Sequence, residues 1–155
     1  MKLGPAHLSR DGEAAARQLG ITVVPVGVRG RDDLEGAISK ISEEKFQAVA
    51  VTIDGLFFVE RQRIADLALA RRLPTIVPSK EMLDAGALIS YGPNTPGLYR
   101  RAAYFIDKIL KGAKPADLPV EQPTSFELLI NLKTANALLI DIPPTLLARA
   151  DGIIE

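Results

Sequence analysis

Apolar and polar positions along the chain follow two patterns in turn. Short β-branched apolar runs are typical of strands buried on both faces, and apolar residues recurring every three or four positions are typical of amphipathic helices. The expected strands are 21–28, 48–53, 75–77 and 87–90. The expected helices are 11–19, one from Asp32 capped with the help of Glu35, one ending near Arg72, and 79–85. This alternation predicts an α/β fold with a doubly wound, mostly parallel sheet and helices on both faces.

The pattern changes after Ser90. Residues 91–97 contain two Pro and two Gly and are predicted to be irregular, and 98–111 form a long amphipathic helix closed by Gly112. Residues 114–123 are Pro-rich and extended. A strand over 126–131, a short helix over 134–139 and a last helix from Pro143 complete the prediction.

Composition excludes several classes of protein. The 155 residues include no Cys and one His, which excludes thiolate catalysis and makes a His-based metal site improbable. Nineteen basic and nineteen acidic residues give a net charge of +0, which argues against binding to nucleic acid. No apolar run is long enough to span a bilayer, and we expect no secretory signal in residues 1–10.

Motifs for catalysis and nucleotide binding are missing. The glycines near Val28 have neither dinucleotide-fold nor Walker A spacing, and there is no G-x-S-x-G sequence. His7 is interpreted as a solvated surface residue, because a lone His near a terminus has no partners to tune it. We therefore expect no catalytic residue, no metal and no cofactor.

Polar residues at the ends of the expected strands form the candidate site, because open α/β sheets bind ligands beyond the carboxyl ends of their strands. The positions are Arg29, then Asp54 with Phe57 and Phe58, then Pro78 and Ser79, and finally Tyr91, Gly92 and Asn94. Such a group suits a small zwitterion with an apolar side chain: the carboxylate pairs with an ammonium and the rings cover the side chain.

Each candidate also has a structural interpretation. Asp54 before Gly55 is a common turn pair, and Phe57 and Phe58 have about even odds of both belonging to the core. Tyr91 is alternatively a surface aromatic residue. Arg29, between glycines, is expected to be a solvated loop cation, and Arg100 with Arg101 to lie on a solvated or interface side of their helix.

The order of these segments resembles one family. Residues 84–138, DAGALISYGPNTPGLYRRAAYFIDKILKGAKPADLPVEQPTSFELLINLKTANAL, and the ending IPPTLLARADGIIE closely resemble ABC-transporter substrate-binding proteins related to the tryptophan/tyrosine-binding lipoproteins. Upstream, AARQLGITVVPVGVRGRDDLEGAI and ADLALARRLPTIVPSKEMLDAGAL are similar to the same family, so the resemblance covers nearly the whole chain.

The resemblance implies the C-terminal half of a type I periplasmic-binding-protein fold, in which two lobes close on a small ligand without covalent chemistry. It implies a small ligand such as an aromatic amino acid, an ABC permease as partner, and a periplasmic or membrane-associated location. A complete gene product without a signal would instead be cytoplasmic. The ligand candidates are Asp54, Phe57, Tyr91, Gly92 and Asn94. The expected single domain comprises 1–92 as a second-lobe-like core, 93–123 as a crossover helix and Pro-rich return, and 124–155 as a C-terminal strand with short helices.

The chain also departs from the family pattern. Only the C-terminal half is represented, Ala87 stands where a second glycine is common, and Leu139 stands where a glycine ends a helix. The alternatives are a truncated stand-alone domain with an assembly role or none, and, with less support, a small α/β enzyme or regulator. Because the helix 98–111 keeps its apolar stripe, we expect a homodimer with this helix at the interface. The stripe consists of Leu98, Ala102, Phe105, Ile106, Ile109 and Leu110.

Overall fold

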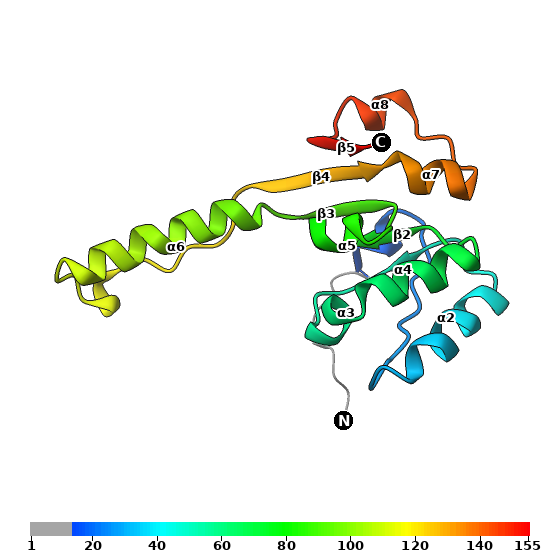
Figure 1. Ribbon diagram of the computed structural model, residues 1–155, viewed down its shortest axis with the longest axis horizontal. Helices are drawn as coiled ribbons and strands as arrows, with labels where there is room; N and C mark the ends of the chain where they lie inside the picture. Colours follow the sequence, from blue (N-terminus) through cyan, green and yellow to red (C-terminus); the bar gives the residue numbers. More distant parts are fainter. Residues whose placement is uncertain (1–13) are drawn as a thin grey trace.

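The computed structural model describes residues 14–155 and contains one mixed sheet of five strands (Figure 1). The strands lie in the order in which they occur in the chain: β1 (Val49–Ala50), β2 (Thr75–Val77), β3 (Ile89–Pro93), β4 (Phe126–Asn131) and β5 (Gly152–Ile154). All neighbouring pairs are parallel except β3 and β4, which are antiparallel. This confirms the predicted α/β class with a mostly parallel sheet.

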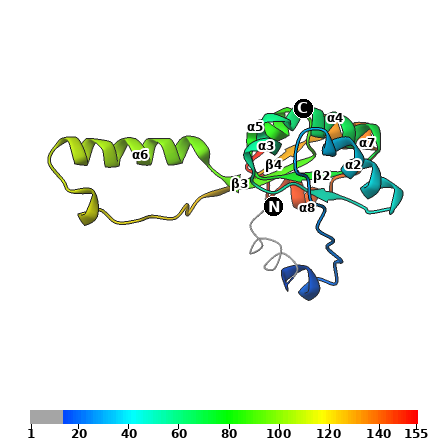
Figure 2. The same cartoon turned by 90° about the horizontal axis from the view of Figure 1, so that it is seen from below.

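Most of the helices cover one face of the sheet, whereas α8 lies on the other (Figure 2). The helices are α2 (Asp33–Glu43), α3 (Gly55–Val59), α4 (Arg61–Ala70), α5 (Lys80–Asp84), α6 (Thr95–Leu110), α7 (Leu132–Leu138) and α8 (Pro144–Leu147). A short 3-10 helix, η1 (Pro115–Asp117), follows α6, and residues 14–18 are also helical. His7 and the beginning of the helix expected over 11–19 lie outside the described residues.

Three apolar clusters form the core. The central cluster joins Val77 of β2 to α5 and the residues that follow it, and Phe57 and Leu129 pack against it. A second cluster joins α2 to α4 through Ile38, Ile41 and Ala68. The third joins the start of β3 to α7. Helices α2, α4, α5 and α7 therefore each bury an apolar side in the core.

The strand expected over 21–28 is not present. These residues form neither helix nor strand, and Ile21, Val23 and Val24 are exposed. The segment runs beside α2, and Val26 packs on the cluster between α2 and α4. A strand needs a backbone partner, but β1 pairs only with β2, and Pro25 has no N–H to donate. The prediction of a buried strand is therefore wrong, and Val26 is the residue of this run that packs on the core.

Strand lengths near the sheet edge also differ from the prediction. The buried strand expected over 48–53 is reduced to β1, two residues that are at most partly buried, because it is paired on one side only. Conversely, Tyr91–Pro93 was expected to be irregular and is part of β3, where it pairs with Phe126–Leu128 of β4. The antiparallel partner extends β3 by three residues and explains this error.

Helix α6 extends from the rest of the molecule as an arm (Figures 1 and 2). It begins at Thr95, three residues earlier than predicted, because Asn94 caps it and Pro96 fits the first turn. None of its sixteen residues is buried. The extended segment 118–125 returns beside it to β4. We call α6 with residues 111–125 the arm.

The remaining predictions hold with shifts of one to three residues. Strands β2 and β4 have the predicted bounds, and α4, α5, α7 and α8 lie where helices were expected. The capping box of α2 does not form, because Asp32 makes no side-chain cap hydrogen bond. Strand β5 was not predicted. In the described part of the chain, no helix is long and apolar enough to cross a membrane.

Candidate functional site

The carboxyl ends of β1, β2 and β3 meet at one edge of the sheet, because these strands are parallel. Asp54 follows β1, Ser79 follows β2 and Asn94 follows β3. Strand β4 runs the opposite way, so its first residues reach the same edge. We call this edge the rim. It is also where α6 leaves the body (Figure 1).

Asp54 is half-buried and caps α3. Its Oδ1 atom accepts a hydrogen bond of 2.7 Å from the backbone N–H of Leu56. The turn interpretation of Asp54 is thus correct for this oxygen. The Oδ2 atom makes no hydrogen bond within the described residues, so one carboxylate oxygen remains for another partner.

The two phenylalanines of α3 lie in different environments. Phe57 packs against the central core cluster beside Val77 and Met82. Phe58 is exposed, and the guanidinium of Arg61 lies 5.0 Å from the centre of its ring. Sequence reasoning gave even odds that both belong to the core, and the structure assigns Phe57 to it and not Phe58.

Tyr91 and Gly92 point to opposite faces of β3, as successive strand residues must. Tyr91 is 59% exposed, and its ring stacks on that of Phe126 at 5.8 Å between ring centres and 22° between ring planes. Gly92 is buried on the face that carries the central cluster, and its backbone packs closely against Pro78. Phe57 lies on this buried face as well, so it does not share a surface with the Tyr91 ring.

Asn94 links β3, α6 and β4. Its Oδ1 atom accepts a hydrogen bond of 2.5 Å from the N–H of Gly97, and its Nδ2 atom donates to Oε1 of Glu127. Its backbone N–H donates to the carbonyl of Ser125. The rim therefore joins Tyr91 and Asn94 to two residues that sequence reasoning missed, Phe126 and Glu127. Only the antiparallel register of β3 and β4 brings these residues together.

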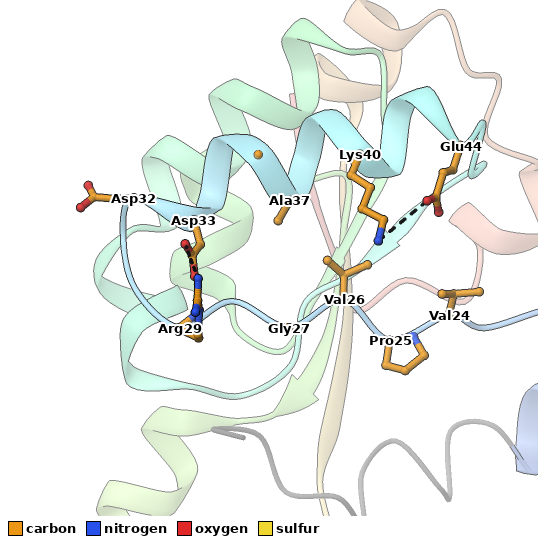
Figure 3. A pocket seen from close by; sticks show the side chains of 11 residues that line it. Val24, Pro25, Val26, Gly27, Arg29, Asp32, Asp33, Ala37, Lys40 and Glu44 are labelled. Atoms are coloured by element: carbon orange, nitrogen blue, oxygen red, sulfur yellow. Dashed lines mark hydrogen bonds and ion pairs between the residues drawn. The ribbon is translucent and has the colours of Figure 1, made fainter. Parts of the chain in front are cut away.

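A separate open pocket of about 570 Å³ lies between α2 and the segment that precedes it (Figure 3). Val24, Pro25, Val26 and Ala37 provide its apolar lining, and charged residues occupy its two ends. At one end the Arg29 guanidinium lies 3.0 Å from Asp33, and at the other Lys40 lies 3.9 Å from Glu44. None of the five predicted ligand residues lines this pocket.

Four of the charged residues that line this pocket pair with one another. The hydrogen bond from Arg29 to Asp33 lowers the pKa of the Asp33 carboxyl and raises the pKa of the Arg29 guanidinium. Arg29 is the solvated loop cation that was predicted. Since the pocket is open and Arg29, Asp33, Lys40 and Glu44 already pair with one another, we regard the rim, and not the pocket, as the candidate ligand site.

The described residues contain no group of three or more His, Asp or Glu side chains able to hold a metal ion. Ser79 has a buried hydroxyl with no hydrogen-bond partner in this part of the chain. The rim offers one free carboxylate oxygen of Asp54, the exposed ring of Tyr91 and the amide–carboxylate pair of Asn94 and Glu127.

A family model described as ABC transporter substrate binding protein matches residues 10–154. The chain belongs to this family. A search of curated protein sequences gave no match. The predicted resemblance is thus confirmed, and it extends over nearly the whole chain.

Solved structures show the same fold. One is an ABC domain from Streptococcus pneumonia in complex with L-Trp, at 26% identity and a TM-score of 0.87, and the match covers 96% of this chain and 50% of that one. A conserved domain protein from Vibrio cholerae is 24% identical with a TM-score of 0.86, covering 95% and 49%. A ligand-free, open substrate-binding protein with adhesive properties from Clostridium difficile is 20% identical with a TM-score of 0.67, covering 98% and 52%. The chain spans about half the length of these structures.

Proposed function

We propose that this chain forms one wall of the solute-binding site of an ABC importer, and that the solute is an amino acid with an aromatic side chain. The family match and the likeness to a structure in complex with L-Trp support the proposal. The observation that carries it is the rim itself, where polar and aromatic residues follow parallel strands at the edge at which α/β sheets bind ligands.

The free Oδ2 atom of Asp54 is suited to an ammonium group, which favours a charged acceptor. The exposed ring of Tyr91, stacked on Phe126, offers an aromatic surface for an apolar side chain. Asp54 follows β1 and Tyr91 lies in β3, and the axes of these two strands are about 10 Å apart because β2 lies between them. An aromatic amino acid is long enough to extend over two strands of the sheet, whereas a single small ion is not.

We assign structural roles to the other three candidates. Gly92 admits the close packing of β3 on Pro78, and Asn94 holds the start of α6 against β4. Phe57 supports α3 from the core side and helps to hold Asp54 in place.

The receptor role implies an ABC permease as partner and a position outside the cytoplasmic membrane, and both belong to the proposal. No catalytic step is part of it.

A ligand that is bound on one side only stays partly exposed to water and makes fewer contacts with the protein. The isolated 155-residue chain is therefore expected to bind weakly. The test is titration of L-Trp into the chain, followed by calorimetry and by NMR chemical shifts of the rim residues. We expect no submicromolar affinity for the monomer, and shifts of Tyr91 and Phe126 at high L-Trp concentration. The absence of any rim shift at saturating concentration contradicts the proposed ligand.

The variant Asp54→Asn separates binding from folding. Asn is as good a helix cap as Asp, so the free energy of unfolding should change little while L-Trp binding weakens. Asp66→Asn is the matched control, since Asp66 is exposed on α4 and its carboxylate accepts a hydrogen bond from Gln62. Unchanged affinity in Asp54→Asn removes Asp54 from the site.

A second candidate function is an assembly domain without a solute. The exposed arm favours it, because no residue of α6 is buried in the described chain. A chain that shows no rim shift with any aromatic amino acid, but does self-associate, would support this alternative.

A further inference from the structure

The hydroxyl of Ser79 is a buried polar group that the fold does not use. Its Oγ atom has no hydrogen-bond partner within the described residues. Buried hydroxyls are normally paired, because an unpaired one has lost its bonds to water without replacement. Ser79 is the N-cap residue of α5, where a serine oxygen usually accepts from a backbone N–H, yet its side chain makes no such bond. The hydroxyl therefore has no structural role among the described contacts.

Ser79 lies at the middle of the rim. It follows β2, which is the strand between β1 and β3. The backbone of Pro78 packs directly against Gly92 of β3, so Ser79 begins beside that strand. Asp54 follows β1 on the other side, and neighbouring strands lie about 5 Å apart. Ser79 is therefore placed between the carboxylate of Asp54 and the strand that carries Tyr91.

The side chain of Ser79 is free to turn. The residue as a whole is partly exposed, although its Oγ atom is covered in this structure. A serine hydroxyl changes its direction by rotation about one bond, which has three staggered positions. Because no hydrogen bond holds the Oγ atom where it is, this rotation breaks no hydrogen bond of the described chain. A ligand that offers an acceptor at the rim can therefore draw the hydroxyl toward itself at little cost.

The proposed solute needs a donor of this kind. An α-amino acid carries its ammonium and its carboxylate on the same carbon atom, so the two groups need partners that lie close together. Asp54 suits the ammonium, but its carboxylate cannot donate to the carboxylate of the solute. The amide of Asn94 already donates to Glu127. Ser79, on the next strand end to Asp54, has a hydroxyl that can donate, and a hydrogen bond to a charged acceptor is a strong one.

We infer that Ser79 is a ligand-binding residue whose hydroxyl donates a hydrogen bond to the carboxylate of the solute. The inference rests on the proposed function and narrows the solute to an α-amino acid with a free carboxylate, so that aromatic amines are not held in the same way. Binding then pairs a hydroxyl that is unpaired in the empty rim. A polar group left unpaired in the fold is typical of a residue whose partner arrives from outside.

The test compares L-Trp with tryptamine, which keeps the ammonium and the indole ring but lacks the carboxylate. Each compound is titrated into the 155-residue chain, and the NMR shifts of the rim amides report binding. Ser79→Ala should weaken the binding of L-Trp about tenfold, the effect of losing one hydrogen bond to a charged group, and leave the binding of tryptamine unchanged. Ser42→Ala is the matched control, because Ser42 is a partly exposed serine on α2, and it should change neither.

Urea unfolding distinguishes a binding role from a structural one. Because the hydroxyl makes no hydrogen bond in the described chain, Ser79→Ala should leave the free energy of unfolding unchanged or raise it. A less stable Ser79→Ala would show that the hydroxyl supports the fold and would overturn the inference. An equal loss of L-Trp and tryptamine binding, or no loss of L-Trp binding in a chain whose rim still responds to L-Trp, would overturn it and leave the proposed function intact. A wild type whose rim does not respond to L-Trp at all would overturn both.

Discussion

The backbone oxygen of Pro78 lies where a side chain at Gly92 would begin: a Cβ atom on Gly92 would be 1.9 Å from it. Pro78 is the first residue after β2, and Gly92 lies in β3. Neither group is the end of a flexible side chain, so the contact can be relieved only by moving β3 relative to the end of β2. The glycine therefore determines how closely these two strand ends approach.

Gly92→Ala is expected to destabilise the fold by about 3 kcal/mol or more, as overpacking of a buried position does. The measurement is the midpoint of urea unfolding. Gly36→Ala is the control, because Gly36 lies inside α2 with nothing within 4 Å of a Cβ atom. There Ala should add about 0.5–1 kcal/mol of stability through helix propensity. If Gly92→Ala leaves the free energy of unfolding unchanged, or raises it as Gly36→Ala does, the two strand ends separate easily and this account is wrong.

Leu139 ends α7 in the left-handed region, with φ 58° and ψ 41°. This conformation costs an L-residue roughly 1–2 kcal/mol, and glycine adopts it freely. The side chain is 83% exposed, so little packing is lost when it is removed. Leu139→Gly should therefore raise the free energy of unfolding by about 1 kcal/mol, and Leu139→Ala should give no such gain. A destabilised glycine variant in thermal unfolding would contradict this account.

The same residue shows what the sequence predicts well. The resemblance indicated a missing glycine at the end of this helix, and the left-handed Leu139 follows from it. Strand β2 and helices α4 and α5 were also predictable, since their apolar periodicity and the stop at Gly86 are local features. In these elements the chain's own pattern is sufficient.

Two errors arose because pairing is not local. Residues 21–28 have the composition of a buried strand, but β1 is not paired with them, so they remain without regular structure. Tyr91 lies in β3 because β4, more than thirty residues later, pairs with it. For the candidate site, position after a strand identified Asp54 and Asn94, whereas Glu127 and Phe126 required the antiparallel register. The sequence could not decide which of Phe57 and Phe58 belongs to the core, because the difference in burial between these adjacent helix residues comes from tertiary packing.

The ion pair between Arg101 and Glu121 should make the arm sensitive to pH. Its hydrogen bond from the guanidinium lowers the pKa of the Glu121 carboxyl below the ordinary value of 4.5. A lowered pKa in the folded state means that the stabilisation is complete above pH 4.5 and is lost as the pH falls through the lowered value. The NMR order parameters of the backbone of residues 120–122 should therefore fall in acid, and salt should have a similar effect at neutral pH.

Glu121→Gln tests this assignment. The variant should show low order parameters over residues 120–122 at neutral pH and little further change on acidification. Glu81→Gln, on the exposed side of α5, is the control and should retain the acid-dependent loosening of the arm. Identical pH profiles for wild type and Glu121→Gln would mean that another group holds the returning segment.

Asn94 makes two side-chain hydrogen bonds that require an amide. Its Oδ1 atom caps α6 by accepting from Gly97, and its Nδ2 atom donates to the carboxylate of Glu127. An Asp at this position keeps the acceptor but replaces the donor with an oxygen, so two carboxylates face each other. Asn94→Asp should lower the free energy of unfolding at neutral pH by about 1–3 kcal/mol, because a donor is lost and like charges are brought together.

The pH dependence distinguishes this repulsion from the loss of a cap. When one of the two carboxyls binds a proton, it again donates a hydrogen bond and the repulsion disappears. The stability difference between wild type and Asn94→Asp, measured by urea unfolding, should therefore shrink as the pH falls below about 5. The double variant Asn94→Asp, Glu127→Gln restores a donor opposite the new carboxylate and should recover most of the stability at neutral pH. A deficit that is constant with pH and survives in the double variant would show that Asn94 acts only as the cap of α6.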